Sequence, residues 1–201
     1  MKDKYCTIKD CSQGYYTEKG SKFISFAFNV NSEQEIKEHL NELKKKYHDA
    51  RHHVFAYILG YEHENYRAND DGEPSNSSGM PVLGQLRSYN LTNVLIVVVR
   101  YFGGTKLGIP GLINAYRSAA KGAIENAEIV EKSITQSYVI TCDYQDINFV
   151  MKSIKDFNAE IKMQNFQEIC KITFEINISL QKDFINTIKQ NKRIKIEDIN
   201  G

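Results

Sequence analysis

The chain of 201 residues lacks the features that would insert it into a membrane or export it. No apolar run approaches the roughly 18 residues that a membrane-spanning helix needs. The first residues, Met1 to Thr7, contain no apolar stretch of the kind that forms a secretory signal. We therefore expect a cytoplasmic protein with no membrane partner.

Cysteine is scarce, and its spacing indicates neither a disulfide framework nor a metal site. The four cysteines form no Cys-x-x-Cys pair and no zinc-binding spacing with the five histidines; they are Cys6, Cys11, Cys142 and Cys170. In a reducing compartment such thiols are ordinary buried or half-buried side chains. The sequence thus predicts no metal and no cofactor.

An excess of charge of one sign is also missing. The chain has 26 basic and 25 acidic side chains, with 16 of each up to residue 131 and then 10 basic against 9 acidic. Domains that bind phosphate backbones over a wide surface carry a clear positive excess. Nucleic-acid binding by this chain would therefore depend on a local basic patch.

The predicted helices and strands fall into two sets, which indicates an α+β fold with two domains. The first set has strands at 21–30, 54–59, 64–68 and 94–99 and helices at 32–47 and 110–127. The run Val94–Val99 is apolar on both faces, as is typical of a central strand. We place this first domain at residues 1–131.

A second pattern begins after Glu131. It has strands at 136–142, 160–166, 170–178 and 194–199, with helices at 143–157 and after Ser179. The order βαββαβ is that of a ferredoxin-like unit. We place this second domain at residues 132–201.

Adjacent histidines stand at the entry to a predicted strand. Neighbouring residues of a strand point to opposite faces, so at most one of His52 and His53 can face a given site. Imidazole is a common metal ligand, but no third ligand stands at a diagnostic offset. We therefore regard His52 as a candidate for ligand binding and the pair as no metal site.

An acidic loop follows, over Asp70–Pro81. It offers Asp70, Asp71, Glu73 and Ser75 as candidate ligand-binding residues. The loop lacks the alternating ligands of a calcium loop. Its carboxylates can serve as acid and base, or bond backbone amides in a tight turn. Because long structured loops commonly carry function, both interpretations stay open.

A glycine-rich turn joins the most apolar strand to a helix. Its candidate residues for binding are Arg100, Gly103, Gly104, Lys106, Gly108, Gly111 and, on the helix, Tyr116. Free amides at a helix start, flanked by two cations, favour an anion such as a phosphate. The spacing matches neither a Walker loop nor the dinucleotide fingerprint. Close packing of helix on sheet would explain Gly104 and Gly111 equally well.

Together these segments resemble the IMPACT family, in its bacterial YigZ-like branch. Lys19–Ile24 is similar to the N-terminal motif of the family, and Ala50–Tyr57 to its histidine strand. Asp70–Pro81 resembles its Asp-Asp-Gly-Glu-Pro loop, although Asn76, Ser78 and Met80 stand where Gly, Ala and Lys are typical. Val97–Tyr116 resembles its long glycine signature.

The resemblance implies a first domain like domain 2 of ribosomal protein S5 and a second like an elongation-factor domain. It also implies regulation of translation and nucleic-acid binding, with RNA, the ribosome or a translation factor as partner. A binding protein acting through the 52–117 face is favoured, because no nucleophile motif or metal set completes a catalytic site. The alternative is a hydrolase or nucleotide-using enzyme with acid–base groups at Asp70–Glu73; the sequence identifies no catalytic residue.

Overall fold

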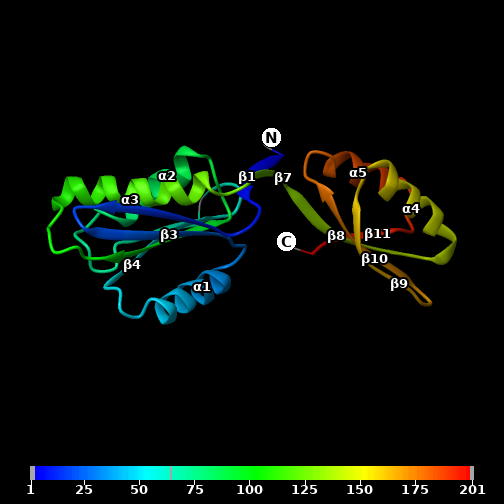
Figure 1. Ribbon diagram of the computed structural model, residues 1–201. Coiled ribbons are helices and arrows are strands. Elements are labelled where there is room, and N and C mark those ends of the chain that lie inside the picture. Colours follow the sequence, from blue (N-terminus) through cyan, green and yellow to red (C-terminus); the bar gives the residue numbers. More distant parts are fainter. Residues whose placement is uncertain (1–2, 64, 200–201) are drawn as a thin grey trace. The chain divides into compact units, whose positions relative to one another are not determined.

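The computed structural model describes residues 3–63 and 65–199 and shows a mixed α+β chain (Figure 1). The chain divides into two compact units. The larger unit is Tyr5–Lys132, and the smaller one joins residues 133–199 to residues 3 and 4. None of the helices in these described residues is both long and apolar enough to cross a membrane.

The larger unit is built on a five-stranded antiparallel sheet. The strands lie in the order β2 (Ser12–Glu18), β3 (Ser21–Asn29), β6 (Val94–Tyr101), β4 (His52–Leu59) and β5 (Asn65–Asn69). The apolar run predicted as a central strand is β6, which is confirmed: it lies between β3 and β4, and every residue from Val94 to Arg100 is buried.

Helices cover both faces of this sheet (Figure 1). The helices α2 (Gly79–Ser88) and α3 (Gly108–Glu125) pack on one face, and α1 (Glu33–Lys46) packs on the other. The predicted helices at 32–47 and 110–127 correspond to α1 and α3. Because strand side chains alternate between faces, β6 contributes Val94, Ile96 and Val98 to one core and Leu95, Val97 and Val99 to the other.

Some elements were absent from our prediction. The helix α2 has ten residues that include Gly79, Pro81 and Gly84, which favour turns and mask its apolar face. The strand β2 was missed, and so were β1 (Lys4–Ile8) and β7 (Ile129–Ser133), which pair as a two-stranded sheet. The strand predicted at 64–68 is β5, and Glu64 lies outside the described residues.

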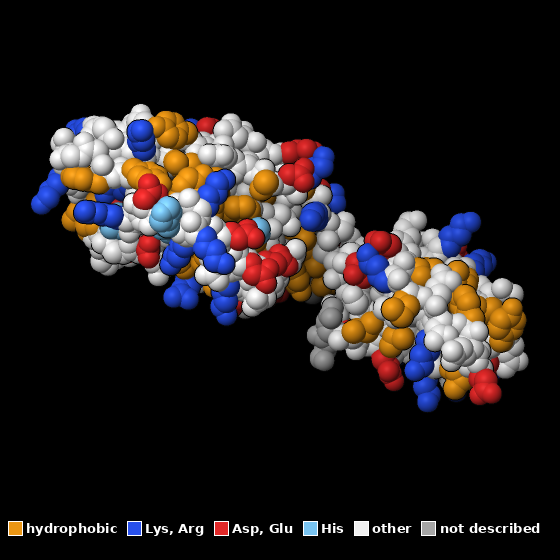
Figure 2. Space-filling view, turned by 60° about the horizontal axis from the view of Figure 1, so that its bottom comes forward, with side chains coloured by type: hydrophobic (Ala, Val, Ile, Leu, Met, Phe, Trp, Pro, Cys, Tyr) orange, Lys and Arg blue, Asp and Glu red, His pale blue; other side chains and the backbone are white. Residues whose placement is uncertain are grey.

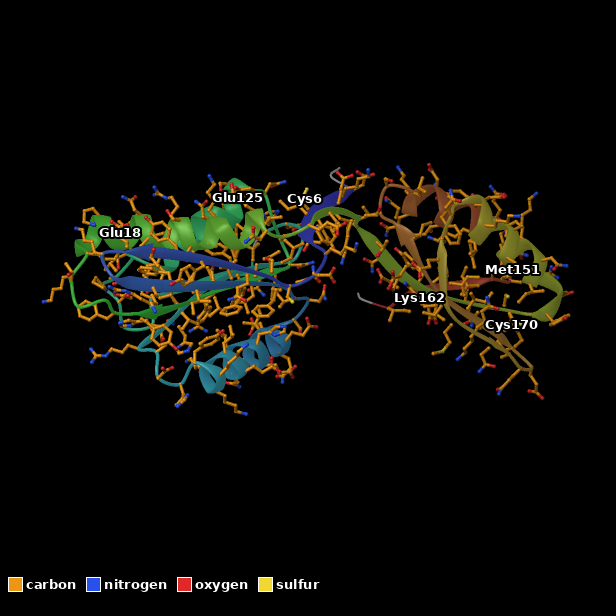
Figure 3. All side chains as sticks on the ribbon, in the orientation of Figure 1. Cys6, Glu18, Glu125, Met151, Lys162 and Cys170 are labelled. Carbon is orange, nitrogen blue, oxygen red and sulfur yellow. The ribbon has the colours of Figure 1, made fainter. Side chains whose placement is uncertain are left out.

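The smaller unit has the predicted element order. It consists of β8 (Thr135–Cys142), a 3-10 turn (Tyr144–Asp146), α4 (Ile147–Asp156), β9 (Glu160–Phe166), β10 (Cys170–Asn177), α5 (Gln181–Ile188) and β11 (Lys195–Asp198). The sheet order is β11-β8-β10-β9, and each neighbouring pair is antiparallel. Val150 of α4 and Phe184 of α5 pack on the sheet in one apolar core. Figure 3 marks Met151 on α4, Lys162 on β9 and Cys170 on β10.

Candidate functional site

The carboxylate of Glu73 is the centre of the candidate site. Its Oε1 accepts hydrogen bonds from Nη1 of Arg100 at 2.5 Å and from the hydroxyl of Tyr116 at 2.7 Å. Nε2 of His52 lies 3.9 Å from the same oxygen. The Glu73 side chain is only 4% exposed, so Arg100 and Tyr116 hold a buried charge in place.

The register of the central strands brings the partners of Glu73 together. Arg100 is directly opposite His52 on one side and Phe23 on the other, so the three side chains form one row across the sheet. Tyr116 of α3 covers this row, with its ring edge-on to Phe23 at 5.1 Å between centroids. The sheet and the helix thus fix Arg100, His52 and Tyr116 around Glu73.

Asp70 organises the loop from within. Its carboxylate accepts hydrogen bonds from the amides of Asn76, Ser78 and Gly79 and from the Ser78 hydroxyl. Burial alone would raise the pKa of Asp70, but these donors outweigh burial and hold it below its ordinary value. Because these donors belong to the loop and to the start of α2, the Asp70 carboxylate fixes the path of the chain into that helix.

Asp71 ties the loop to the histidine strand. Its side chain accepts a hydrogen bond from the His53 amide at 2.6 Å, and its carbonyl lies 2.8 Å from Nδ1 of His52. Because a carbonyl only accepts, Nδ1 of His52 carries the proton in this contact. His52 therefore turns Nε2 toward Glu73.

The departures of the loop from the usual family pattern have a backbone explanation at one position. Asn76 has a φ of 61°, in the left-handed region. Asparagine tolerates that region better than other residues with a side chain, so it can replace the glycine that is typical there. Ser75 is exposed and lies outside the group of side chains around Glu73.

The glycine turn packs against the turn between β2 and β3. A Cβ on Gly103 would come within 1.9 Å of the Gly20 backbone, so no larger residue fits there. The Gly103 amide donates to the Ser21 hydroxyl at 3.2 Å, and Nη2 of Arg100 reaches the same oxygen at 3.4 Å. Gly104 has a φ of 88° and open space around it. Close packing therefore accounts for Gly103, and backbone conformation for Gly104.

A hollow of about 340 Å³ lies beside Glu73. The acidic loop contributes Glu73 and Pro74 to its wall. The end of β6 and the following turn contribute Arg100 and Phe102. The rest of the wall comes from residues 106–109 and from Leu112 of α3. Lys106 is exposed, and so are half of Phe102 and more than half of Ile109. Gly111 packs against Leu107 rather than lining the hollow.

The structure corrects one electrostatic expectation. We expected Arg100 and Lys106 together to attract an anion to the glycine-rich turn. Arg100 is instead buried, with its side chain 7% exposed, and it is paired with Glu73. Its charge is therefore largely neutralised, and Lys106 is the cation of the pair that faces solvent.

Two buried groups near the site have shifted pKa values. Burial, reinforced by the Glu73 carboxylate, raises the pKa of Tyr116, so the hydroxyl keeps its proton and donates it. Burial lowers the pKa of His53, whose Nε2 is buried without a partner. His53 faces the α1 side of the sheet, away from Glu73, as the alternation of strand side chains requires.

Within residues 3–63 and 65–199, no group of three His, Cys, Asp or Glu side chains is arranged to hold a metal ion. Two contributors to the site were missed from the sequence: Ser21, which links Arg100 to Gly103, and Phe102, which borders the hollow. Both lie inside motifs that carry the family resemblance. Figure 2 shows basic side chains interspersed with acidic and apolar ones on the visible face of the larger unit.

Comparison with known proteins places these residues in a family context. A sequence profile described as the Impact N-terminal domain matches residues 19–124. The chain is 32% identical over 168 residues to the "IMPACT family member YvyE" of Bacillus subtilis (strain 168), covering 84% of this chain and 77% of that protein. It is 28% identical over 151 residues to the "IMPACT family member YigZ" of Escherichia coli (strain K12), covering 74% of each.

Eukaryotic relatives match over a shorter length. The "Protein IMPACT homolog" of Saccharomyces cerevisiae (strain ATCC 204508 / S288c) is 32% identical over 116 residues, covering 55% of this chain and 44% of that protein. Among solved structures, one titled "Crystal structure of an hypothetical protein" aligns with a TM-score of 0.75 and 22% identity, over 99% of this chain and 98% of its own. This likeness shows a shared fold along the chain.

Proposed function

The chain belongs to the IMPACT family, and from that premise we propose that it is a regulatory binding protein of translation. It contacts RNA, the ribosome or a translation factor in the cytoplasm, through the face formed by residues 52–117. The observation that carries this proposal is the hollow beside Glu73. A concave apolar site with a few fixed polar groups is the usual form of a ligand-binding site.

The bonding of the polar side chains favours binding over catalysis. Asp70 and Asp71 bond backbone amides, Oε1 of Glu73 accepts from Arg100 and Tyr116, and Nδ1 of His52 bonds a carbonyl. Groups held in this way are rigid recognition elements. The enzyme alternative then depends on Glu73 and His52, whose 3.9 Å separation is longer than the direct hydrogen bond that proton transfer between them would need.

The finer fold assignment is part of the same proposal. The smaller unit has the order βαββαβ and an antiparallel sheet ordered β11-β8-β10-β9, which support a ferredoxin-like domain resembling an elongation-factor domain. For the larger unit, the family resemblance supports a fold like domain 2 of ribosomal protein S5.

Ribosome co-sedimentation and RNA filter binding test the proposal with one charge-reversal pair. Lys106→Glu changes the exposed cation beside the hollow, and Lys37→Glu makes the same change on α1, across the sheet. We expect Lys106→Glu to weaken binding and Lys37→Glu to leave it unchanged. RNA affinity should fall with salt along a shallow slope, because few phosphates are contacted.

Two results would count against this function. If Lys106→Glu and Lys37→Glu bind equally well, the interface does not lie on the face formed by residues 52–117. Turnover of a nucleotide by the wild-type protein, lost in Glu73→Gln and detected by mass spectrometry, would favour the enzyme alternative.

A further inference from the structure

The two oxygens of the Glu73 carboxylate have different environments. Oε1 accepts two hydrogen bonds, from Arg100 and from Tyr116, which equals the number of its lone pairs. Among the described residues, both of the donors that bond the Glu73 carboxylate are directed at Oε1, and none is directed at Oε2. Because Glu73 lines the hollow, Oε2 is the oxygen of this carboxylate that keeps acceptor capacity for a ligand there.

Within the hollow, Glu73 thus offers an acceptor, whereas the charge of Arg100 is already paired. Arg100 also lines the hollow, but its Nη1 bonds Glu73, its Nη2 contacts Ser21, and its Nε is buried without a partner. A phosphate placed beside Glu73 would meet a negative carboxylate whose neighbouring cation, Arg100, is already paired with it. A ligand group with N–H donors would instead complete the hydrogen bonding of a fixed carboxylate, and such charge-assisted bonds are strong.

The walls and the rim add two further requirements. Pro74, Leu107 and Leu112 make the walls largely apolar, and the half-exposed ring of Phe102 borders the opening. Aromatic and apolar walls suit a flat ring, because a base can stack on them. The exposed ammonium group of Lys106 suits a phosphate at the rim. The volume of about 340 Å³ lies at the lower end of the range for small-molecule sites.

We propose that the hollow binds a single guanine nucleotide with the base innermost, its N1–H and N2–H edge on Oε2 of Glu73 and its phosphate near Lys106. The inference rests on the proposed function and names the ligand class of the same site. Guanine is favoured because its Watson–Crick edge has two adjacent donors. Adenine, cytosine and uracil each place an acceptor lone pair next to their donor, and a carboxylate repels it.

The same chemistry can come from a free nucleotide or from an unpaired guanine in RNA. Calorimetry with GMP, IMP, AMP, CMP and UMP addresses the first source. Filter binding of a five-nucleotide RNA with a central guanine or inosine addresses the second. Inosine lacks the N2 amino group, so it loses one hydrogen bond to a charged acceptor. In whichever of the two experiments binding is detected, we therefore expect the inosine ligand to bind about tenfold more weakly than the guanine ligand.

Three variants test separately the contacts to the phosphate, to the base ring and to the Watson–Crick edge. Lys106→Ala should weaken GMP but not guanosine, which has no phosphate. Phe102→Ala, at a half-exposed position, should weaken all bases alike. Glu73→Gln should reduce the preference for GMP over AMP at least tenfold, with folding checked by circular dichroism. Because the Lys106 and Phe102 variants change surface residues, the result does not depend on Glu73→Gln folding.

The outcomes distinguish this inference from the proposed function. Equal affinity for GMP and AMP, or binding of arginine amide in place of any nucleotide, overturns the guanine assignment. If Lys106→Glu still weakens ribosome or RNA binding in that case, the binding function stands with a different ligand. If GMP binds with the expected preference but ribosomes and RNA do not, the guanine site stands and the translation-associated role fails.

Discussion

The hydroxyl of Tyr116 donates a 2.7 Å hydrogen bond to Oε1 of Glu73, and so joins α3 to a loop that precedes it by 43 residues. The Tyr116 side chain is completely buried, and burial raises its pKa, so the hydroxyl stays a donor. The bond fixes the orientation of a carboxylate that lines the hollow. It therefore links the stability of the fold to the geometry of the candidate site.

Tyr116→Phe should lower the free energy of unfolding by about 1.5–3 kcal/mol, because it removes a buried hydrogen bond to a charged group. Urea denaturation measures the change. Tyr89→Phe is the matched control, since the Tyr89 hydroxyl makes an exposed 3.3 Å contact with Glu125. We expect a change within about 0.5 kcal/mol there. Equal losses in the two variants would contradict a special role for the Tyr116 bond.

Arg100→Ala and Lys106→Ala should differ in stability, although both remove a cation beside the hollow. Arg100→Ala leaves the buried Glu73 charge without its ion pair, which costs about 3–5 kcal/mol. Lys106 is exposed, so its loss should change stability by no more than about 0.5 kcal/mol. Chemical denaturation of each variant compares them.

The double variant Glu73→Leu with Arg100→Leu serves as the control for the ion pair. Removing both charges should recover part of the stability that Arg100→Ala loses, because no unpaired charge is then buried. A double variant less stable than the single one would show that another contact of Arg100 dominates.

His53 should make the fold less stable as the pH falls below neutrality. Burial lowers its folded pKa, an effect that Lys44 adds to and Asp71 opposes, whereas the unfolded imidazole titrates near its ordinary value of about 6.5. Between these two pKa values the unfolded state binds more protons, so the free energy of unfolding decreases as the pH decreases from about 6.5 toward the folded pKa.

Urea denaturation between pH 7.5 and 5 would measure this dependence. His53→Leu should flatten the curve over that range, and His48→Gln, at an exposed position, should leave it as in the wild type. A slope that persists unchanged in His53→Leu would assign the pH dependence to another group.

The two units should fold independently. A fragment of residues 1–132 keeps the five-stranded sheet and its three helices, so we expect it to give a dispersed amide spectrum by nuclear magnetic resonance. Limited proteolysis of the full chain should cut first between about residues 128 and 136. Loss of dispersion in the fragment, or early cuts elsewhere with none in this segment, would contradict a domain boundary there.

Local features were predictable where local physics decides them. Ser32 and Glu35 predicted the start of α1, and the Ser32 hydroxyl does accept the Glu35 amide. The all-apolar run predicted β6 as a central strand, because a strand buried on both faces excludes polar side chains. The helix α2 escaped prediction, since its glycines and proline favour turns until packing against the sheet fixes it.

From the sequence, Asp70, Asp71 and Glu73 were equal candidates for ligand binding, but their side chains have different roles in the folded loop. Asp71 and Gly72 have φ values of 43° and 86°, so the chain turns sharply between Asp70 and Glu73. As a result of this turn, the Asp70 and Asp71 carboxylates accept hydrogen bonds from backbone amides, and the Glu73 carboxylate bonds Arg100 of the sheet. No spacing rule separates these roles, because they depend on where the loop meets β4 and β6.

By itself the sequence determined the family, the α+β class and the segments that meet at the candidate site. Apolar periodicity and short motifs encode those properties along the chain, where they can be recognised residue by residue. Only the tertiary structure decided which charges are free. The pairing of Arg100 with Glu73 follows from strand register and loop path, and a charge buried beside an opposite charge no longer attracts a distant ligand as a solvated one does.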